Sequence, residues 1–108
     1  MRMNLSREEA LELIARYRDQ IDDVDRRLVD LLNERTGIVE KLGRVKEELD
    51  LPIYEPRRED DVFANVTAAN AGPLPPEALK RLFERIVDEM RSLQRINRAK
   101  TEKAEPGG

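Results

Sequence analysis

The sequence has 108 residues, of which 40% are charged and only 4% aromatic, and its formal net charge is −3. It contains no cysteine and no histidine, which excludes disulfides, thiolate chemistry, histidine-based acid–base catalysis and the commonest protein metal ligand. The negative charge balance does not favour bulk nucleic-acid binding, so an enzyme built from this chain would work with Arg, Lys, Asp, Glu and Gln.

The first predicted element is one long helix over residues 6–49, preceded by a loose leader at residues 1–5. Ser6 followed by Glu9 is a capping box, which marks the start of the helix. Apolar residues then recur in steps of three and four, the a/d pattern of a helix that packs along another helix. We call these positions the seam: Ile14, Tyr17, Ile21, Val24, Leu28, Leu31, Arg35, Ile38, Leu42, Val45 and Leu49. Arg35 alone is charged, and a charge inside a seam is costly unless an anion meets it.

The length of this helix predicts a partner. About 43 residues at ~1.5 Å each make a rod of roughly 65 Å. A globule of this chain length has a radius of gyration of only ~13 Å, so the chain cannot cover such a rod by itself. We therefore predict an obligate homodimer in which two long helices lie side by side.

Two glycines, Gly37 and Gly43, lie inside the predicted helix. Each costs up to ~1 kcal/mol relative to Ala. They are either tolerated weak points or places where a missing side chain lets a neighbouring helix or a ligand approach closely, and the sequence favours neither explanation.

Two shorter helices follow. Pro52 ends the first helix, and Pro56 suits the first position of a second helix over residues 56–69. A turn-rich loop over residues 70–75 leads to a third helix over residues 76–98. Its predicted buried stripe ends with an inward-facing amide and consists of Leu79, Leu82, Phe83, Ile86, Val87, Met90, Leu93 and Gln94.

The predicted fold is therefore all-α, with three helices per chain in an intertwined homodimer. One helical domain covers residues 6–99, and residues 100–108 read as a disordered tail. No apolar run approaches 18 residues and no signal-peptide core is present, so we expect a cytoplasmic protein.

Several charged residues have the spacing of a shared site. Arg35 and Lys46 are eleven residues apart, three turns plus about 20°, and therefore point to the same side of the helix. In an antiparallel dimer, Arg18 of the partner subunit would come alongside Arg35. Arg35 could equally be a specificity charge in a coiled coil, while Lys46 and the charge run at residues 57–61 would more often be solvated. From spacing alone, a dimeric helical interaction module is slightly favoured over an enzyme.

Two motifs resemble a known family, the all-helical (AroQ-type) chorismate mutases. The pattern Arg18-Asp-Gln-Ile21-(x3)-Asp25-(x2)-Leu28-(x2)-Leu31-Leu32-(x)-Glu34-Arg35, continuing to Val39, Gly43 and Lys46, is similar to the long first helix of these enzymes. The segment Pro52-Ile53-Tyr54-Glu55-Pro56-Arg57-Arg58-Glu59 is similar to the motif P-[IV]-x-D-x-x-R-E at the start of their second helix, and Gln94 falls where they place an ether-binding Gln.

The resemblance implies a role for each matching residue. Arg35 and Arg58, with Arg18 of the partner subunit, would bind the two carboxylates of chorismate. Lys46 and Gln94 would donate to its ether oxygen, and Glu59, aided by Glu55, would accept its ring hydroxyl. Glu55 departs from the usual Asp, and Met90 stands where some members have a ligand-contacting Ser.

The implied reaction is the conversion of chorismate to prephenate in aromatic amino-acid biosynthesis, which needs no metal or cofactor. Two alternatives stay open on the sequence. Isochorismate pyruvate lyases resemble these mutases and use similar cations. A non-catalytic, regulatory helical module that partners DAHP synthase would have a related sequence.

Overall fold

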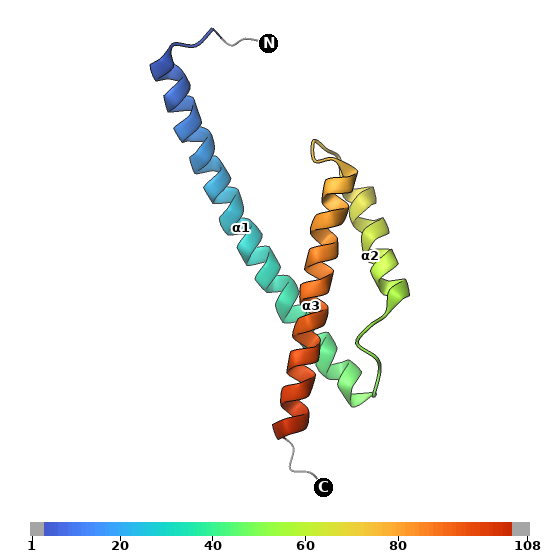
Figure 1. Cartoon of the computed structure of the whole chain (residues 1–108). Coiled ribbons are helices and arrows are strands. Elements are labelled where there is room, and N and C mark those ends of the chain that lie inside the picture. The colour runs from blue at the N-terminus through green and yellow to red at the C-terminus, as the bar shows by residue number, and fades with distance from the viewer. Residues whose placement is uncertain (1–3, 105–108) are drawn as a thin grey trace. The chain divides into compact units, whose positions relative to one another are not determined.

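The computed structural model describes residues 4–104 and contains three helices, α1 (Arg7–Glu48), α2 (Pro56–Ala69) and α3 (Pro76–Ala104) (Figure 1). No strand occurs in these described residues, which confirms the predicted all-α class. The chain divides into two compact units, Met1–Arg35 and Thr36–Gly108. The end of α1 therefore belongs to the second unit, together with α2 and α3.

The first unit is the N-terminal part of α1. The helix begins where the sequence predicts, because the Ser6 hydroxyl oxygen accepts a hydrogen bond from the Glu9 backbone N–H at 3.1 Å. Asn4 and Leu5 precede the helix, and the rest of the predicted leader lies outside the described residues.

The ten apolar seam positions are all exposed in the single chain. Their exposed fractions range from 43% at Ile14 to 65% at Leu49. A single helix has no means of burying its own apolar stripe, so these side chains stay in water unless another chain covers them. Large solvent-exposed apolar stripes of this kind mark interaction surfaces.

The C-terminal end of α1 is a Schellman motif. The Leu51 N–H donates to the Lys46 carbonyl at 2.7 Å, and the Asp50 N–H donates to the Glu47 carbonyl at 3.1 Å. Asp50 adopts the left-handed conformation that this motif requires, with φ of 54°. Pro52 follows two residues later, as expected from its inability to continue a helix. The chain reverses here and passes back beside the last turn of α1.

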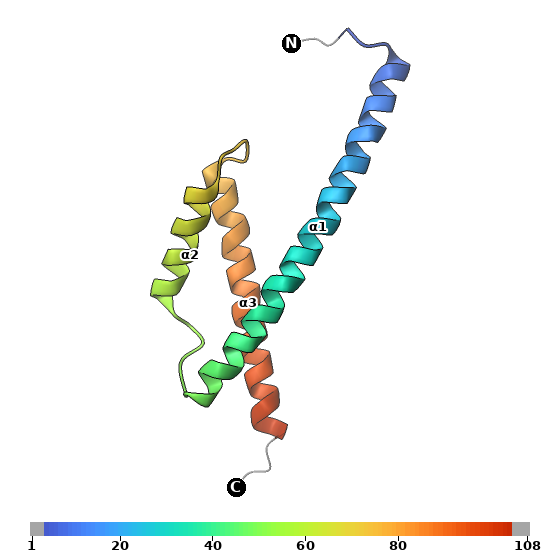
Figure 2. The same ribbon diagram turned by 180° about the vertical axis from the view of Figure 1, so that it is seen from behind.

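Helices α2 and α3 pack side by side as an antiparallel pair (Figure 1, Figure 2). They begin at proline residues, as predicted, and the one buried apolar residue of the described chain, Val87, lies on α3 and is 8% exposed. Leu82 was predicted to be buried with the same stripe but is 55% exposed, because one neighbouring helix covers only one side of α3. The connection is fixed by Asn70, whose side-chain oxygen accepts from the Gly72 N–H and whose amide donates to the Leu74 carbonyl.

The start of α2 lacks a side-chain cap. Glu55 occupies the N-cap position but makes no capping hydrogen bond, and only its backbone carbonyl takes part, accepting from the Glu59 N–H at 3.1 Å. Its carboxylate is directed elsewhere, as described below.

The predicted end of the third helix near Arg98 is wrong. α3 continues to Ala104, so residues 100–104 are helical rather than a disordered tail, and residues 105–108 lie outside the described part. The sequence has no Gly or Pro between Arg98 and Pro106, so nothing interrupts the helix. Arg98 also anchors this segment by donating to the Leu51 carbonyl at 3.0 Å.

Among residues 4–104, no helix combines the length and the apolar composition that crossing a membrane requires.

Candidate functional site

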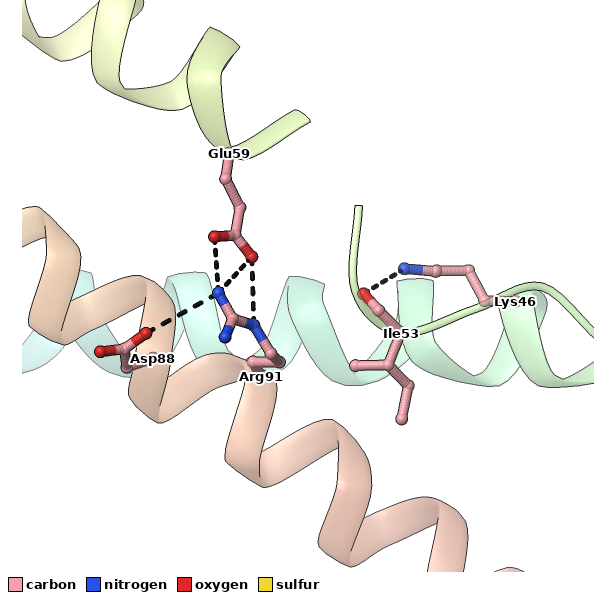
Figure 3. A network of polar contacts seen from close by, with 5 residues as sticks. All are labelled: Lys46, Ile53, Glu59, Asp88 and Arg91. Carbon is pink, nitrogen blue, oxygen red and sulfur yellow. Dashed lines mark hydrogen bonds and ion pairs between the residues drawn. The ribbon is translucent and has the colours of Figure 1, made fainter. Parts of the chain in front are cut away.

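Lys46, in the last turn of α1, is buried, with only 5% of the residue exposed. Its ammonium nitrogen lies 2.6 Å from a carboxylate oxygen of Glu55. The same nitrogen donates to the Ile53 carbonyl at 3.0 Å (Figure 3). The chain reversal after Asp50 brings both partners back beside α1. The interpretation of Lys46 as a solvated helix charge is therefore wrong: it is a buried, fixed cation.

Glu59, in the first turn of α2, pairs with Arg91 of α3. The Arg91 Nη2 atom lies 2.5 Å from both carboxylate oxygens, and Nε donates to Oε2 at 3.1 Å (Figure 3). Both side chains are only 21% exposed. The prediction that the charged residues 57–61 are exposed is therefore wrong for Glu59. It is correct for the neighbouring Arg58, which is exposed.

Sequence reasoning did not identify Arg91. A signal was present, because Arg91 follows the buried Val87 by four residues and precedes Gln94 by three, which places all three on one side of the helix. Two further contacts hold its guanidinium group. It lies over the Tyr54 ring at 4.6 Å from the centroid, and Asp88 is 3.7 Å away.

Gln94 lies partly buried on α3 opposite Gly43 of α1. A Cβ atom at Gly43 would lie 3.6 Å from the Gln94 Cγ atom, an ordinary van der Waals distance, so this approach does not require a glycine, and nothing lies within 4 Å of the corresponding position at Gly37. The Gln94 Oε1 atom is buried and has no hydrogen-bond partner in the described structure. An orphaned amide oxygen of this kind is costly unless a ligand or water satisfies it.

A groove of about 320 Å³ adjoins Gln94, between the last turns of α1 and α3. Its lining is polar and mixed in charge: Glu40, Gly43, Arg44, Glu47, Gln94, Asn97, Arg98, Lys100 and Thr101. Lys46 and Glu59 do not line this groove.

Met90 faces α1 rather than open space. Its sulfur atom accepts a hydrogen bond from the Thr36 hydroxyl at 3.5 Å. The thioether therefore has a packing partner within the chain. The absence of the ligand contact that a Ser makes here in some family members stays a prediction.

Arg18 and Arg35 belong to the first unit and are described with it. Arg18 is exposed and Arg35 is half-buried. The second unit thus brings together two charged pairs, Lys46 with Glu55 and Glu59 with Arg91, bridged by the segment around Tyr54.

These groups are suited to holding a polar ligand and to stabilising charge. Lys46 is a compact buried donor, Glu59 is a carboxylate acceptor, and Gln94 is a neutral amide. Within residues 4–104, no group of three or more acidic side chains is arranged to hold a metal ion.

The fold and these side chains define an all-helical protein with a small polar site of Lys, Glu, Arg and Gln. The chain belongs to the family described as chorismate mutase type II, whose family model matches residues 17–95. This membership confirms the family resemblance found in the sequence.

Individual relatives agree with this membership. The bifunctional chorismate mutase/prephenate dehydratase of Aquifex aeolicus is 32% identical over 89 residues, which are 79% of this chain and 25% of that protein. The T-protein of Enterobacter agglomerans is 41% identical over 73 residues, 67% of this chain and 20% of that protein. The chain thus spans about a quarter or less of the length of these curated relatives.

One solved structure matches this chain over most of the length of both chains. The chorismate mutase (Form II) of Thermus thermophilus has a TM-score of 0.74 and 39% identity, and the match covers 76% of this chain and 93% of that chain.

Proposed function

We propose that this chain is a chorismate mutase, an isomerase that rearranges chorismate to prephenate in aromatic amino-acid biosynthesis. The observation that carries the proposal is the buried ammonium group of Lys46, held at 2.6 Å by Glu55 and at 3.0 Å by the Ile53 carbonyl, in a chain of the chorismate mutase type II family. Such a fixed donor suits a reaction in which negative charge develops on one oxygen atom.

The chemistry explains why a site without His or Cys is adequate. The rearrangement is a [3,3] shift within one molecule, in which no proton moves and no nucleophile attacks. The enzyme has to hold the enolpyruvyl arm over the ring, and it has to stabilise charge on the ether oxygen as the C–O bond stretches. Planar guanidinium groups hold carboxylates in one orientation, while Lys and Gln donate to the ether oxygen.

We assign the residues as the family resemblance implies. Arg35 and Arg58, with Arg18 of the partner subunit, bind the two carboxylates of chorismate. Lys46 and Gln94 donate to the ether oxygen, Gln94 through its amide N–H. Glu59, supported by the segment at Glu55, accepts the ring hydroxyl.

We also propose that the working form is a homodimer. The ten exposed apolar seam positions support this, because a second copy presents the same stripe and would cover it. The dimer is functional as well as structural in this proposal, since it supplies Arg18. The proposed location is the cytoplasm, and docking on a DAHP synthase stays a prediction that co-purification would reveal.

The direct test is to add the purified protein to chorismate and identify the product. We expect prephenate, and we expect Arg35→Ala to lower kcat/KM by about 10²-fold or more, because a carboxylate clamp is lost. Arg26→Ala is the matched control, since Arg26 is an exposed arginine of the same helix that pairs with Asp23.

Two results would contradict the assignment. Pyruvate released from isochorismate, with little prephenate, would identify a lyase. A folded dimer that converts neither substrate would leave a binding module.

Gln94→Glu is expected to make activity depend on acid pH. An amide donates at any pH, whereas a carboxyl group donates only when protonated, and its ordinary pKa is about 4.3. Activity of the variant should therefore rise as the pH falls from 7 towards 5, while wild type changes little. Gln94→Met, which lacks a donor at every pH, should stay low throughout. An unchanged pH profile of kcat/KM in Gln94→Glu would remove Gln94 from the ether-oxygen role.

A further inference from the structure

Arg91 lies outside the assigned site but contacts three separate parts of the second unit: α2, the connection before it, and the preceding turn of α3. It forms a two-pronged ion pair with Glu59 of α2 and has Asp88 one turn before it on α3 (Figure 3). It also lies over the Tyr54 ring in the connection. With 21% of its side chain exposed, it is largely enclosed by these contacts. No role has been assigned to it so far.

The geometry fixes the Glu59 carboxylate in one orientation. Arg91 Nη2 reaches both oxygens at 2.5 Å and Nε reaches Oε2 at 3.1 Å, so the planar guanidinium approaches the carboxylate from one side. Each carboxylate oxygen has two acceptor positions, so the three hydrogen bonds from Arg91 leave one of the four available, on Oε1. A ligand hydroxyl can therefore donate to Glu59 without displacing Arg91.

The contact with Tyr54 extends this support towards Lys46. Tyr54 stands between Ile53, whose carbonyl accepts from Lys46, and Glu55, whose carboxylate pairs with Lys46. Arg91 thus contacts Glu59 directly and, through Tyr54, the short segment that holds Lys46.

We propose that Arg91 is a positioning and specificity-determining residue: it holds Glu59 ready to accept the ring hydroxyl of the substrate and so makes the site select substrates that carry this hydroxyl. This inference rests on the proposed function. The physical reason is preorganisation, because a free Glu side chain samples several rotamers and loses that freedom on binding, whereas a clamped one does not. Lysine would not replace it fully, since a point charge lacks the planar fork.

The test compares two substrates, chorismate and an analogue in which hydrogen replaces the ring hydroxyl. Wild type should have a higher kcat/KM for chorismate. Arg91→Gln should lower kcat/KM for chorismate by about 10- to 100-fold and leave that for the analogue nearly unchanged, so the preference collapses. A merely structural role would lower both values equally. Arg85→Gln is the matched control, because Arg85 is an exposed arginine of α3 paired with Glu89, and it should change neither value.

Three further variants test whether Arg91 acts through Glu59. Glu59→Ala should abolish the same preference, and adding Arg91→Gln to it should cause no further loss, since the two residues act through one contact. Arg91→Lys keeps a cation but loses the fork; it should also reduce the preference, and it serves if Arg91→Gln does not fold.

The outcomes separate the two proposals. If wild type forms prephenate and Arg91→Gln and Arg91→Lys keep the full preference for the hydroxyl, the inference is wrong and the proposed function stands. If wild type forms no prephenate, the proposed function is wrong and this inference falls with it.

Discussion

Lys46→Met is expected to lower kcat for chorismate by about 10²–10³-fold, the effect of removing one fixed donor from an oxyanion-type site. The side chain of Met has a similar length but no charge, so the ether oxygen would lose its buried donor. KM should change less, because the interaction is strongest in the transition state. Steady-state kinetics with chorismate, together with a thermal unfolding curve for each variant, measures this effect.

The matched control is Lys41→Met. Lys41 lies on the same helix five residues earlier and is exposed, so its loss should leave kcat unchanged. A Lys46→Met variant that keeps kcat within about threefold of wild type while remaining folded would contradict the ether-oxygen role.

Leu28→Glu is expected to convert the dimer to monomers and, with it, to abolish activity. Leu28 is a seam residue that is 50% exposed in the single chain, and each dimer would bury two copies of it. Burying a Leu is worth about 1.5–3 kcal/mol, so losing two copies should raise the dissociation constant by roughly 10²- to 10⁴-fold. Sedimentation across a concentration series measures the oligomeric state directly.

Val29→Glu controls for the added charge. Val29 is 55% exposed and lies about 100° further around the helix, away from the seam, so the dimer should persist. A Leu28→Glu variant that remains dimeric and active at low micromolar concentration would refute the seam as the subunit interface.

Local signals in the sequence were sufficient to place most helix boundaries. The cap at Ser6 and the prolines at positions 52, 56 and 76 act through neighbouring backbone groups, and the structure starts or ends helices there. The wrong prediction for the end of α3 also concerns a local signal. The polar, charged composition after Arg98 suggests disorder, but the segment contains no helix breaker before Pro106, and the helix continues to Ala104.

The site was predictable only in part, because ion pairs between helices depend on tertiary packing. Lys46 was singled out, but its burial depends on the chain reversal that brings Ile53 and Glu55 beside it. Arg91 was missed because its partner Glu59 is 32 residues away, and no periodicity along one helix reveals that pairing. The assignments of Arg18, Arg35 and Arg58 stay predictions for the experiments above.

The uncapped start of α2 shows that the Glu55 carboxylate pairs with Lys46 rather than capping the helix that follows it. A short polar side chain at position 55 would cap the helix, a change worth typically ~1 kcal/mol. Glu55 instead directs its carboxylate to Lys46 at 2.6 Å. A protein engineer who replaced Glu55 with Ser to raise the melting temperature would therefore gain a sturdier helix and leave the buried ammonium without its counter-ion. Thermostabilising designs for this scaffold should leave position 55 unchanged and seek their gains elsewhere.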